Sequence, residues 1–291
     1  MTPLKATDQL SQTVANLLAG ILAITALALT AILIIISQPP TSHLNPNQLV
    51  LKNGPGMQYK SVNLTKTVAA NAGAKKHGWQ AFKLNSGKTV WVNEWNLAHP
   101  QTKKHALTGT TIVLDPGHGG NDSGALYRKN LTKKQYEEKT YTLKFAQQLA
   151  TKLRAQGAHV IMTRNNDVYK SLGERTRLSN RVQADAFVSF HFDSAPQDNL
   201  ASGFTTYYYH KNQATKKLAK TVSANLTGLP LTNRGIDFAD YYVLHRNHRP
   251  AILLEMGYIN TTKDFRQIQN PTYQQKVVDD VERGLIQYFK D

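Results

Sequence analysis

An uncharged stretch near the N-terminus constrains the fold of this 291-residue chain more than any other feature. Residues 14–36 contain only three polar side chains, Asn16, Thr25 and Thr30. About 20 apolar residues are enough to cross a bilayer as a helix, whereas the apolar region of a cleaved signal peptide is about 7–15 residues long. The stretch is longer than that and is followed by Ser37-Gln38-Pro39-Pro40 rather than a small-x-small cleavage site. The sequence therefore predicts a transmembrane anchor at 14–36, with cleavage of the anchor left as the alternative.

An excess of positive charge lies entirely after this stretch. The chain has 35 Lys and Arg against 19 Asp and Glu, a net charge of +16. Residues 45–100 carry seven lysines and one glutamate, a net of +6, and residues 101–291 carry +10. Such an excess indicates an anionic partner. We expect residues 1–13 in the cytoplasm and the rest of the chain outside the cell. The predicted partner is therefore an anionic cell-wall polymer of a Gram-positive bacterium, together with peptidoglycan, and not nucleic acid.

The composition narrows the chemistry. No cysteine is present, which excludes a disulfide scaffold, a thiolate zinc site and a cysteine nucleophile. An exported protein without cysteine does not rely on small disulfide-stapled folds. Hydrophobic residues make up 41% of the chain, which is enough to bury a core and excludes a disordered chain.

A small β-rich segment follows the anchor. The Pro-rich, polar residues 37–48 predict a linker. After it, residues 49–98 contain short β-rich runs at 49–51, 65–68, 79–84 and 89–92, separated by turn signals at 53–56, 71–73 and 86–88. This pattern predicts a small all-β barrel.

The same segment resembles bacterial SH3-like domains. The resemblance rests on the turn Asn53-Gly54-Pro55-Gly56, the pair Gly78-Trp79 and the ending at 87–92. Two positions depart from the family pattern, because Lys52-Asn53 replaces the usual Arg before the turn and Val90 replaces the usual Gly. The resemblance implies cell-wall binding. Trp79 and Trp91 are predicted to be core residues rather than a ligand platform.

The remaining sequence alternates between strand and helix patterns. Residues 99–109 predict a second linker. Strands are then expected at 111–115, 159–163, 186–190, 204–209 and 251–254, and helices at 133–156, 171–183, 212–226 and 273–289. The alternation predicts an α/β domain at 110–291, with a mostly parallel or mixed sheet flanked by helices.

Three of these strands lead into a side chain that could bind a metal or carry a proton. The first leads through Asp115-Pro116-Gly117 to His118, another leads to His191, and the last leads to Glu255. Ligands of open α/β sheets bind at the carboxyl ends of the strands, so we expect these side chains to converge. Two histidines with carboxylates and no cysteine suggest a catalytic zinc site with three protein ligands and one open position.

Helical geometry offers a candidate for the third ligand. At about 100° per residue, Glu138 borders the apolar stripe of the predicted helix 133–156, whereas Glu137 points away from it. A carboxylate at the edge of the stripe, in the first helical turn, could reach the strand ends. The alternative is that both glutamates only favour a helix N-terminus through its dipole.

Several motifs resemble the zinc-dependent N-acetylmuramoyl-L-alanine amidases. Residues 114–124 (Leu-Asp-Pro-Gly-His-Gly-Gly-Asn-Asp-Ser-Gly) resemble the opening motif of that family. Further matches follow in the family's order at Glu138-Lys139 with Leu143, at 160–164 with Asp167, at 189–191 and at 250–260, so that the resemblance covers nearly all of residues 110–289.

The resemblance implies a ligand set and a reaction. His118, Glu138 and His191 would bind one Zn²⁺, and Glu255 would be the catalytic carboxylate. The bond cleaved would be the amide between the lactyl group of N-acetylmuramic acid and the first L-alanine of the stem peptide. The metal would activate a water, and Glu255 would move its proton to the leaving amine. Asp193 departs from the family's usual Asn at that position.

Two other functions remain as alternatives. One is a different zinc hydrolase of peptidoglycan, either a peptidase or a sugar deacetylase. The other is a wall-binding protein with an inactive hydrolase domain, which the complete set of four site residues argues against.

Some further residues have two interpretations. Asp115 could orient a zinc-binding histidine, or only open a Pro-Gly turn. Arg164 and Arg175 could hold substrate carboxylates or pair with Asp167 and Glu174. His245 and His248 have a spacing that could bind metal, but their neighbouring arginines favour a solvated loop.

Overall fold

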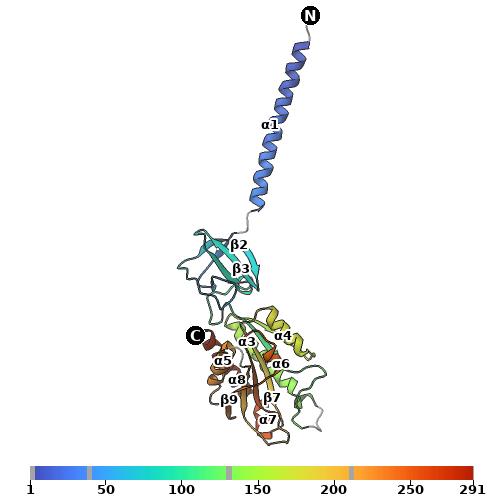
Figure 1. Cartoon of the computed structure of the whole chain (residues 1–291), viewed down its shortest axis with the longest axis vertical. Coiled ribbons are helices and arrows are strands. Elements are labelled where there is room, and N and C mark those ends of the chain that lie inside the picture. Colours follow the sequence, from blue (N-terminus) through green and yellow to red (C-terminus); the bar gives the residue numbers. More distant parts are fainter. Residues whose placement is uncertain (1–3, 38–40, 129–132, 210–212, 291) are drawn as a thin grey trace. The chain divides into compact units, whose positions relative to one another are not determined.

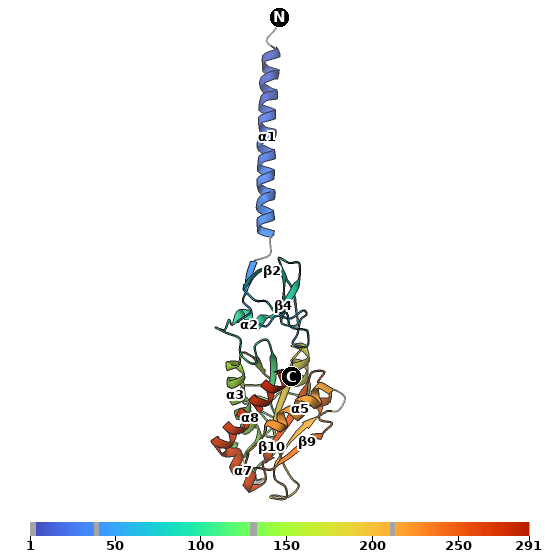
Figure 2. The same cartoon turned by 90° about the vertical axis from the view of Figure 1, so that its left-hand side faces the viewer.

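The computed structural model describes residues 4–37, 41–128, 133–209 and 213–290. The chain divides into two compact units, Met1–Ser42 and His43–Asp291 (Figure 1). Figure 2 shows the same elements after a quarter turn.

The first unit is dominated by one long helix, α1 (Leu4–Ser37). Its part from Gln12 to Thr30 spans 19 residues with a mean hydropathy of 2.0, which is long and apolar enough to cross a membrane. Thr25 Oγ1 donates to the carbonyl of Ile21 at 3.0 Å, and Thr30 Oγ1 donates to that of Ala26 at 2.7 Å. These hydroxyls are therefore paired within the helix, as an apolar surrounding demands.

A four-stranded sheet, in the order β1-β2-β3-β4, forms the small β domain. Its elements are β1 (Thr41–Leu44), β2 (Val68–Lys76), β3 (Trp79–Leu84) and β4 (Thr89–Asn93), followed by the short helix α2 (Glu94–Ala98). Strand β3 pairs antiparallel with both β2 and β4. Trp79 is buried in this domain, as predicted, while Trp91 is half-buried.

The strand boundaries of this domain differ from the expected ones. The expected strand at 49–51 is not formed, and only Val68 of the run 65–68 belongs to a strand. Residues 41–44, placed in the linker 37–48, form β1, because Leu44 is fully buried in the core. The expected turn at 71–73 lies inside β2, where the register shifts after Ala72 and makes a bulge. The hairpin turn is His77-Gly78, both with positive φ (53° and 76°), the geometry of a tight two-residue turn.

The large domain is built on a six-stranded mixed sheet in the order β6-β5-β7-β10-β8-β9. The strands are β5 (Thr111–Pro116), β6 (His159–Met162), β7 (Ala186–Asp193), β8 (Phe204–Tyr208), β9 (Asn233–Phe238) and β10 (Ala251–Tyr258). The first four strands in this order are parallel, and β8 runs antiparallel to β10. The predicted mixed α/β sheet is confirmed.

Helices cover both faces of this sheet because successive strand residues point to opposite sides. They are α3 (Glu138–Ala155), α4 (Leu172–Arg181), α5 (Gln213–Asn225), α6 (Tyr242–His245), α7 (Thr262–Gln269) and α8 (Pro271–Lys290). Ile112 and Leu114 pack with α3, α5 and α8 in the main core, whereas Val113 packs on the other face with Val243 and Leu244 of α6. Figure 1 shows α4 and α6 on the side of the sheet away from α5 and α8.

The two domains of the second unit meet through buried polar contacts, which we call the joint. Asn96 of α2 donates to the carbonyl of Gly157 (3.1 Å) and accepts from the N–H of Gly109 (2.8 Å). Asn93 donates to the carbonyl of Gly109 (3.0 Å), and Trp95 stacks on His159 of β6. Residues 99–109 were predicted as a linker, but Leu107 and Thr108 at their end are buried, so this part of the connection is packed.

Candidate metal centre and catalytic pocket

The site lies at the carboxyl ends of neighbouring parallel strands. Strand β5 lies between β6, the next strand in the chain, and β7, which follows β6, so the order of the strands reverses at β5. Open α/β sheets bind their ligands at such a point. His118 follows β5, and His191 lies on β7. Glu255 of β10 is in register with His191, so both side chains point to the same side of the sheet. Strands β7 and β10 run further than expected, and these two residues lie within them.

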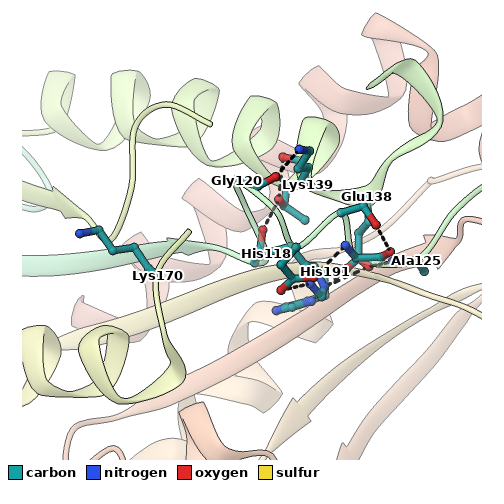
Figure 3. A network of polar contacts seen from close by, with 12 residues as sticks. His118, Gly120, Ala125, Glu138, Lys139, Lys170 and His191 are labelled. Atoms are coloured by element: carbon teal, nitrogen blue, oxygen red, sulfur yellow. Dashed lines mark hydrogen bonds and ion pairs between the residues drawn. The ribbon is translucent and has the colours of Figure 1, made fainter. Parts of the chain in front are cut away.

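Three side chains form one group that could hold a metal ion, and Figure 3 shows them together. They are His118, Glu138 and His191, and one nitrogen or oxygen atom from each lies within 4.8 Å of the others. His118 Nε2 is 3.1 Å from Glu138 Oε2, and His191 Nδ1 is 2.9 Å from Glu138 Oε1. Among the described residues no other group of this kind occurs.

Glu138 reaches this group because α3 begins with it. The expected helix 133–156 is split into a 3-10 turn at Lys134–Tyr136 and α3. The carboxylate of Glu138 accepts from the N–H of Ala125 (2.8 Å) and from that of Phe192 (3.0 Å). Burial opposes its ionisation, but His118 and His191 outweigh burial and lower the pKa of Glu138. This carboxylate is therefore ionised.

Glu137 stays outside the group. Its Oε2 lies 3.4 Å from the ammonium of Lys139. The helical phase that singled out Glu138 therefore agrees with the geometry.

His118 is held in an unusual backbone conformation. Its φ is +59°, a left-handed value that costs about 1–3 kcal/mol outside glycine. Asp122 Oδ2 lies 2.9 Å from His118 Nδ1, and Arg175 Nη2 donates to the His118 carbonyl at 2.9 Å. Burial works against a charged imidazole, but Glu138 and Asp122 outweigh it and raise the pKa of His118. The surroundings thus favour positive charge at this point.

Asp115 and Arg175 pair with each other, whereas the sequence suggested Glu174 as the acid for Arg175. Asp115 is fully buried and accepts from Arg175 Nη1 (2.7 Å), Thr163 Oγ1 (2.6 Å) and Ser189 Oγ (2.8 Å). Arg164 donates to the carbonyls of Pro116 and Gly117. Asp122, which the sequence did not single out, is the carboxylate that orients His118. The sequence feature that could have pointed to Asp122 is its position four residues after His118 in the same Gly-rich loop.

Arg164 and Arg175 therefore position the backbone of the loop that carries His118. Arg175 bonds the carbonyls of both Pro116 and His118. Both guanidinium groups lie inside the protein and are not available to hold a substrate.

Glycines allow the histidine rings to approach this loop. A Cβ atom at Gly117 would overlap the ring of His191. A Cβ atom at Gly124, whose φ is +67°, would meet both Glu138 and His118. The Gly-rich sequence of the loop is thus required by the close packing of the three candidate ligands.

Glu255 lines a cavity of about 440 Å³ together with His118, Asp122 and His191. Within the described part of the chain, its buried Oε2 atom has no hydrogen-bond partner. Burial raises the pKa of Glu255 well above its usual value, and the charges of Glu138 and Asp193 add to this. A carboxylate with an unpaired oxygen and a raised pKa in a cavity is typical of an acid–base group.

The donor set fits a zinc ion. Two imidazole nitrogens and one carboxylate oxygen are usual zinc ligands, and donors about 2 Å from the metal lie about 3.3 Å apart in a tetrahedral site. One donor atom from each of the three side chains lies within 4.8 Å of the others, which is close enough for a single ion to be held among them after small adjustments. Asp122 would fix the tautomer of His118, as carboxylates beside zinc-binding histidines commonly do.

The second histidine pair is not part of this site. His245 ends α6, and its Nδ1 atom lies 2.9 Å from Asp240 Oδ1. The backbone N–H of His248 donates to Asn180. Neither belongs to the metal-binding group. The predicted solvated loop holds for the exposed His248 only, because His245 is half-buried at the end of helix α6.

Comparison with known proteins identifies the class of hydrolase that this fold and pocket define. Residues 112–287 match the family model described as N-acetylmuramoyl-L-alanine amidase. The chain belongs to this family, whose members hydrolyse the amide between N-acetylmuramic acid and L-alanine in peptidoglycan.

Curated relatives agree with this assignment. The chain is 37% identical over 247 residues to "Probable cell wall amidase LytH" of Staphylococcus epidermidis, covering 82% of this chain and 81% of that protein. It is 40% identical over 212 residues to the protein of the same name from Staphylococcus aureus, covering 70% and 69%.

Solved structures share the fold of the large domain. An N-acetylmuramoyl-L-alanine amidase from Clostridium difficile 630 superposes with a TM-score of 0.59 at 34% identity, covering 62% of this chain and 97% of that one. The amidase AmiC2 of Nostoc punctiforme gives a TM-score of 0.57 at 31% identity, covering 65% and 99%.

Proposed function

We propose that the chain is a zinc-dependent N-acetylmuramoyl-L-alanine amidase that acts on peptidoglycan from the outer face of the cell membrane. One observation carries the metal assignment: His118, Glu138 and His191 come from three separate segments and converge on one point. Glu255 stands beside them with an unpaired carboxylate oxygen.

The residues divide the work of amide hydrolysis. When bound, Zn²⁺ would polarise the scissile carbonyl and make a water nucleophilic near neutral pH. Glu255 accepts the proton of the attacking water and passes it to the nitrogen of the departing L-alanine. Its raised pKa suits both steps, because the carboxyl group can hold the proton between them. The buried ion pair of Asp115 and Arg175 keeps the His118 loop in place.

The N-terminal helix supports a single-pass membrane anchor. The segment Gln12–Thr30 is apolar enough to span a bilayer. We place residues 1–13 in the cytoplasm and both folded domains outside, because the substrate lies there. The staphylococcal relatives are named as probable cell wall amidases, which supports this location.

We assign wall binding to the small β domain. Its four-stranded sheet and its turn sequences support an SH3-like module. Its net charge of +6 supports attraction to the anionic polymers of a Gram-positive wall. Nucleic acid is not expected as a partner.

Product analysis tests the reaction. The full chain in detergent micelles is incubated with purified peptidoglycan, and the soluble products are weighed by mass spectrometry. We expect intact stem peptides with a free L-alanine amine, and glycan strands without peptide. Shortened peptides still attached to sugar would instead indicate a peptidase, and deacetylated sugars a deacetylase.

Metal removal tests the cofactor in the same assay. A chelator should abolish the release of stem peptides, and one equivalent of Zn²⁺ per chain should restore it. Full activity in a preparation shown by elemental analysis to hold no metal would contradict the zinc assignment.

A further inference from the structure

The catalytic cavity shares two lining residues with a second cavity along α4. Lys170 and Arg175 line the cavity that contains Glu255, and they also line a neighbouring cavity of about 460 Å³. That neighbouring cavity extends along α4 to Arg177 and Arg181. We call this second cavity the α4 groove; its lining residues are Thr163, Lys170, Glu174, Arg175, Arg177, Leu178 and Arg181.

Lys170 lines both the catalytic cavity and the α4 groove. It also lines a third cavity of about 680 Å³ beside β6. In Figure 3 its side chain lies apart from the three candidate metal ligands, on the loop that leads into α4. Its ammonium is therefore placed to contact a bound molecule away from the reacting atoms.

The α4 groove carries an excess of positive charge. Arg177 and Arg181, one helical turn apart, are exposed, and neither forms a salt bridge within 4.0 Å among the residues that the structure describes, although the charge of Arg177 acts on Glu174. Glu174 is the one acid of the groove. Its Oε2 atom accepts from the N–H and the hydroxyl of Ser171 in the capping box of α4. Its Oε1 atom lies 3.7 Å from Lys170 Nζ, an exposed pair of small energy. The cations of the groove could therefore still bind an anion.

Two tyrosines add neutral aromatic surface to the catalytic cavity. Tyr241 and Tyr242 line it and are 42% and 41% exposed. Burial raises the pKa of Tyr241 to about 12, and the charge of Glu255 adds to this, so its hydroxyl stays neutral. The cavity thus combines neutral aromatic side chains with the cation of Lys170.

The two halves of the substrate differ in the same way. The N-acetylated sugar that precedes the scissile amide carries no charge once its lactyl carboxyl group is in that amide. The stem peptide that follows ends in a carboxylate. We propose that the stem peptide leaves the catalytic cavity past Lys170 and lies in the α4 groove, where Lys170, Arg177 and Arg181 attract its carboxylates. This inference rests on the proposed amidase function and adds the direction in which the substrate binds.

The test compares two soluble substrates with the full chain in detergent micelles. Both contain one N-acetylmuramic acid and the same stem peptide; in one the terminal carboxylate is free, and in the other it is an amide. We expect the wild type to have a KM about 5- to 10-fold lower for the free carboxylate, with equal kcat. The preference should weaken in salt, because exposed charges are screened within about 10 Å at 0.1 M.

Variants locate the preference. Lys170→Ala and the double variant Arg177→Ala/Arg181→Ala should each raise KM for the free carboxylate and leave kcat unchanged. Lys216→Ala/Lys220→Ala on α5 is the matched control, since it removes two exposed charges one turn apart outside the groove. The charge reversal Arg177→Glu/Arg181→Glu should make the amide the better substrate. Affinity for the released stem peptide is measured by calorimetry on the metal-free chain. It should fall most in the variants whose KM for the free carboxylate rises most.

Each outcome separates the two proposals. If the wild type cleaves both substrates and the groove variants keep its preference, the α4 groove does not hold the peptide and the inference is overturned. If the variants instead lose only retention on intact wall, the groove binds a wall polymer and the inference is equally overturned. If the wild type cleaves neither substrate but releases other products, the proposed function itself fails.

Discussion

The joint and the catalytic pocket are both built from buried polar side chains of distant segments, but they use their polar atoms differently. In the joint, the amide groups of Asn93 and Asn96 have partners for both their oxygen and their nitrogen. In the pocket, an oxygen of Glu255 has no partner among the described residues. Paired polar groups hold the two domains together, whereas the unpaired one is available for chemistry.

The largest expected effect is on the pocket. Glu138→Ala should lose bound metal and all measurable amidase activity, because it removes one candidate ligand and the shared partner of His118 and His191. Glu137→Ala, its matched control, should keep both near the wild-type level, since it removes no candidate ligand and Lys139 keeps Asp167 as its ion-pair partner. Metal content and rate are measured on the same preparations. A metal-free Glu137→Ala with a metal-loaded Glu138→Ala would reverse the assignment.

The joint should respond with stability instead of activity. Asn96→Ala leaves the N–H of Gly109 and the carbonyl of Gly157 without their partner, which should cost about 1–3 kcal/mol of unfolding free energy. Metal content should not change. Asn63→Ala, an exposed asparagine of the same domain, is the control and should be nearly silent. Chemical denaturation provides the measurement, and an unchanged midpoint for Asn96→Ala would show that the joint contributes little.

An effect of pH of similar size is expected from Asp185, whose carboxylate accepts from the N–H of Thr111 (2.8 Å) next to the joint. Burial raises the pKa of Asp185 from 3.8 to about 6, against the lowering effect of the Thr111 N–H and of Arg249. Between these two pH values the folded chain holds a proton that the unfolded chain has lost. Stability from this group should therefore be greatest below about pH 4 and fall by up to about 3 kcal/mol as the pH rises to 6.

The variant Asp185→Asn isolates that contribution from other titrating groups. The difference in unfolding free energy between wild type and variant should shift in favour of the variant from pH 4 to pH 7. A difference that is constant over this range would mean that the pKa of Asp185 is not raised in the folded chain.

Much of the pocket could be predicted because its residues follow regular elements. His118, His191 and Glu255 lie on or directly after apolar strands whose carboxyl ends meet at one edge of the sheet. Glu138 could be separated from Glu137 by helical phase. The role of Asp122 could not be predicted, because it depends on the path of a Gly-rich loop in which His118 has a left-handed backbone conformation.

The joint could not be predicted for a different reason. Asn96 and Gly157 are 61 positions apart, and no local pattern indicates which polar groups will pair over that distance. The edge strand β9 was missed as well, because its exposed, polar sequence lacks the alternation of a half-buried strand. A regular element is recognised in a sequence by apolar residues spaced so that they fall on one buried face. Neither the polar residues of the joint nor strand β9 shows such spacing.

Glu255→Gln tests the central claim most directly, because it changes the proposed acid–base group and leaves the three candidate metal ligands intact. Gln has nearly the same shape but cannot accept the proton of the attacking water. Zinc content, melting temperature and amidase rate are measured on one preparation of the full chain. We expect about one zinc per chain, a melting temperature no lower than that of the wild type, and a rate reduced by at least about 100-fold. A variant with full zinc and near-normal turnover would contradict the role of Glu255.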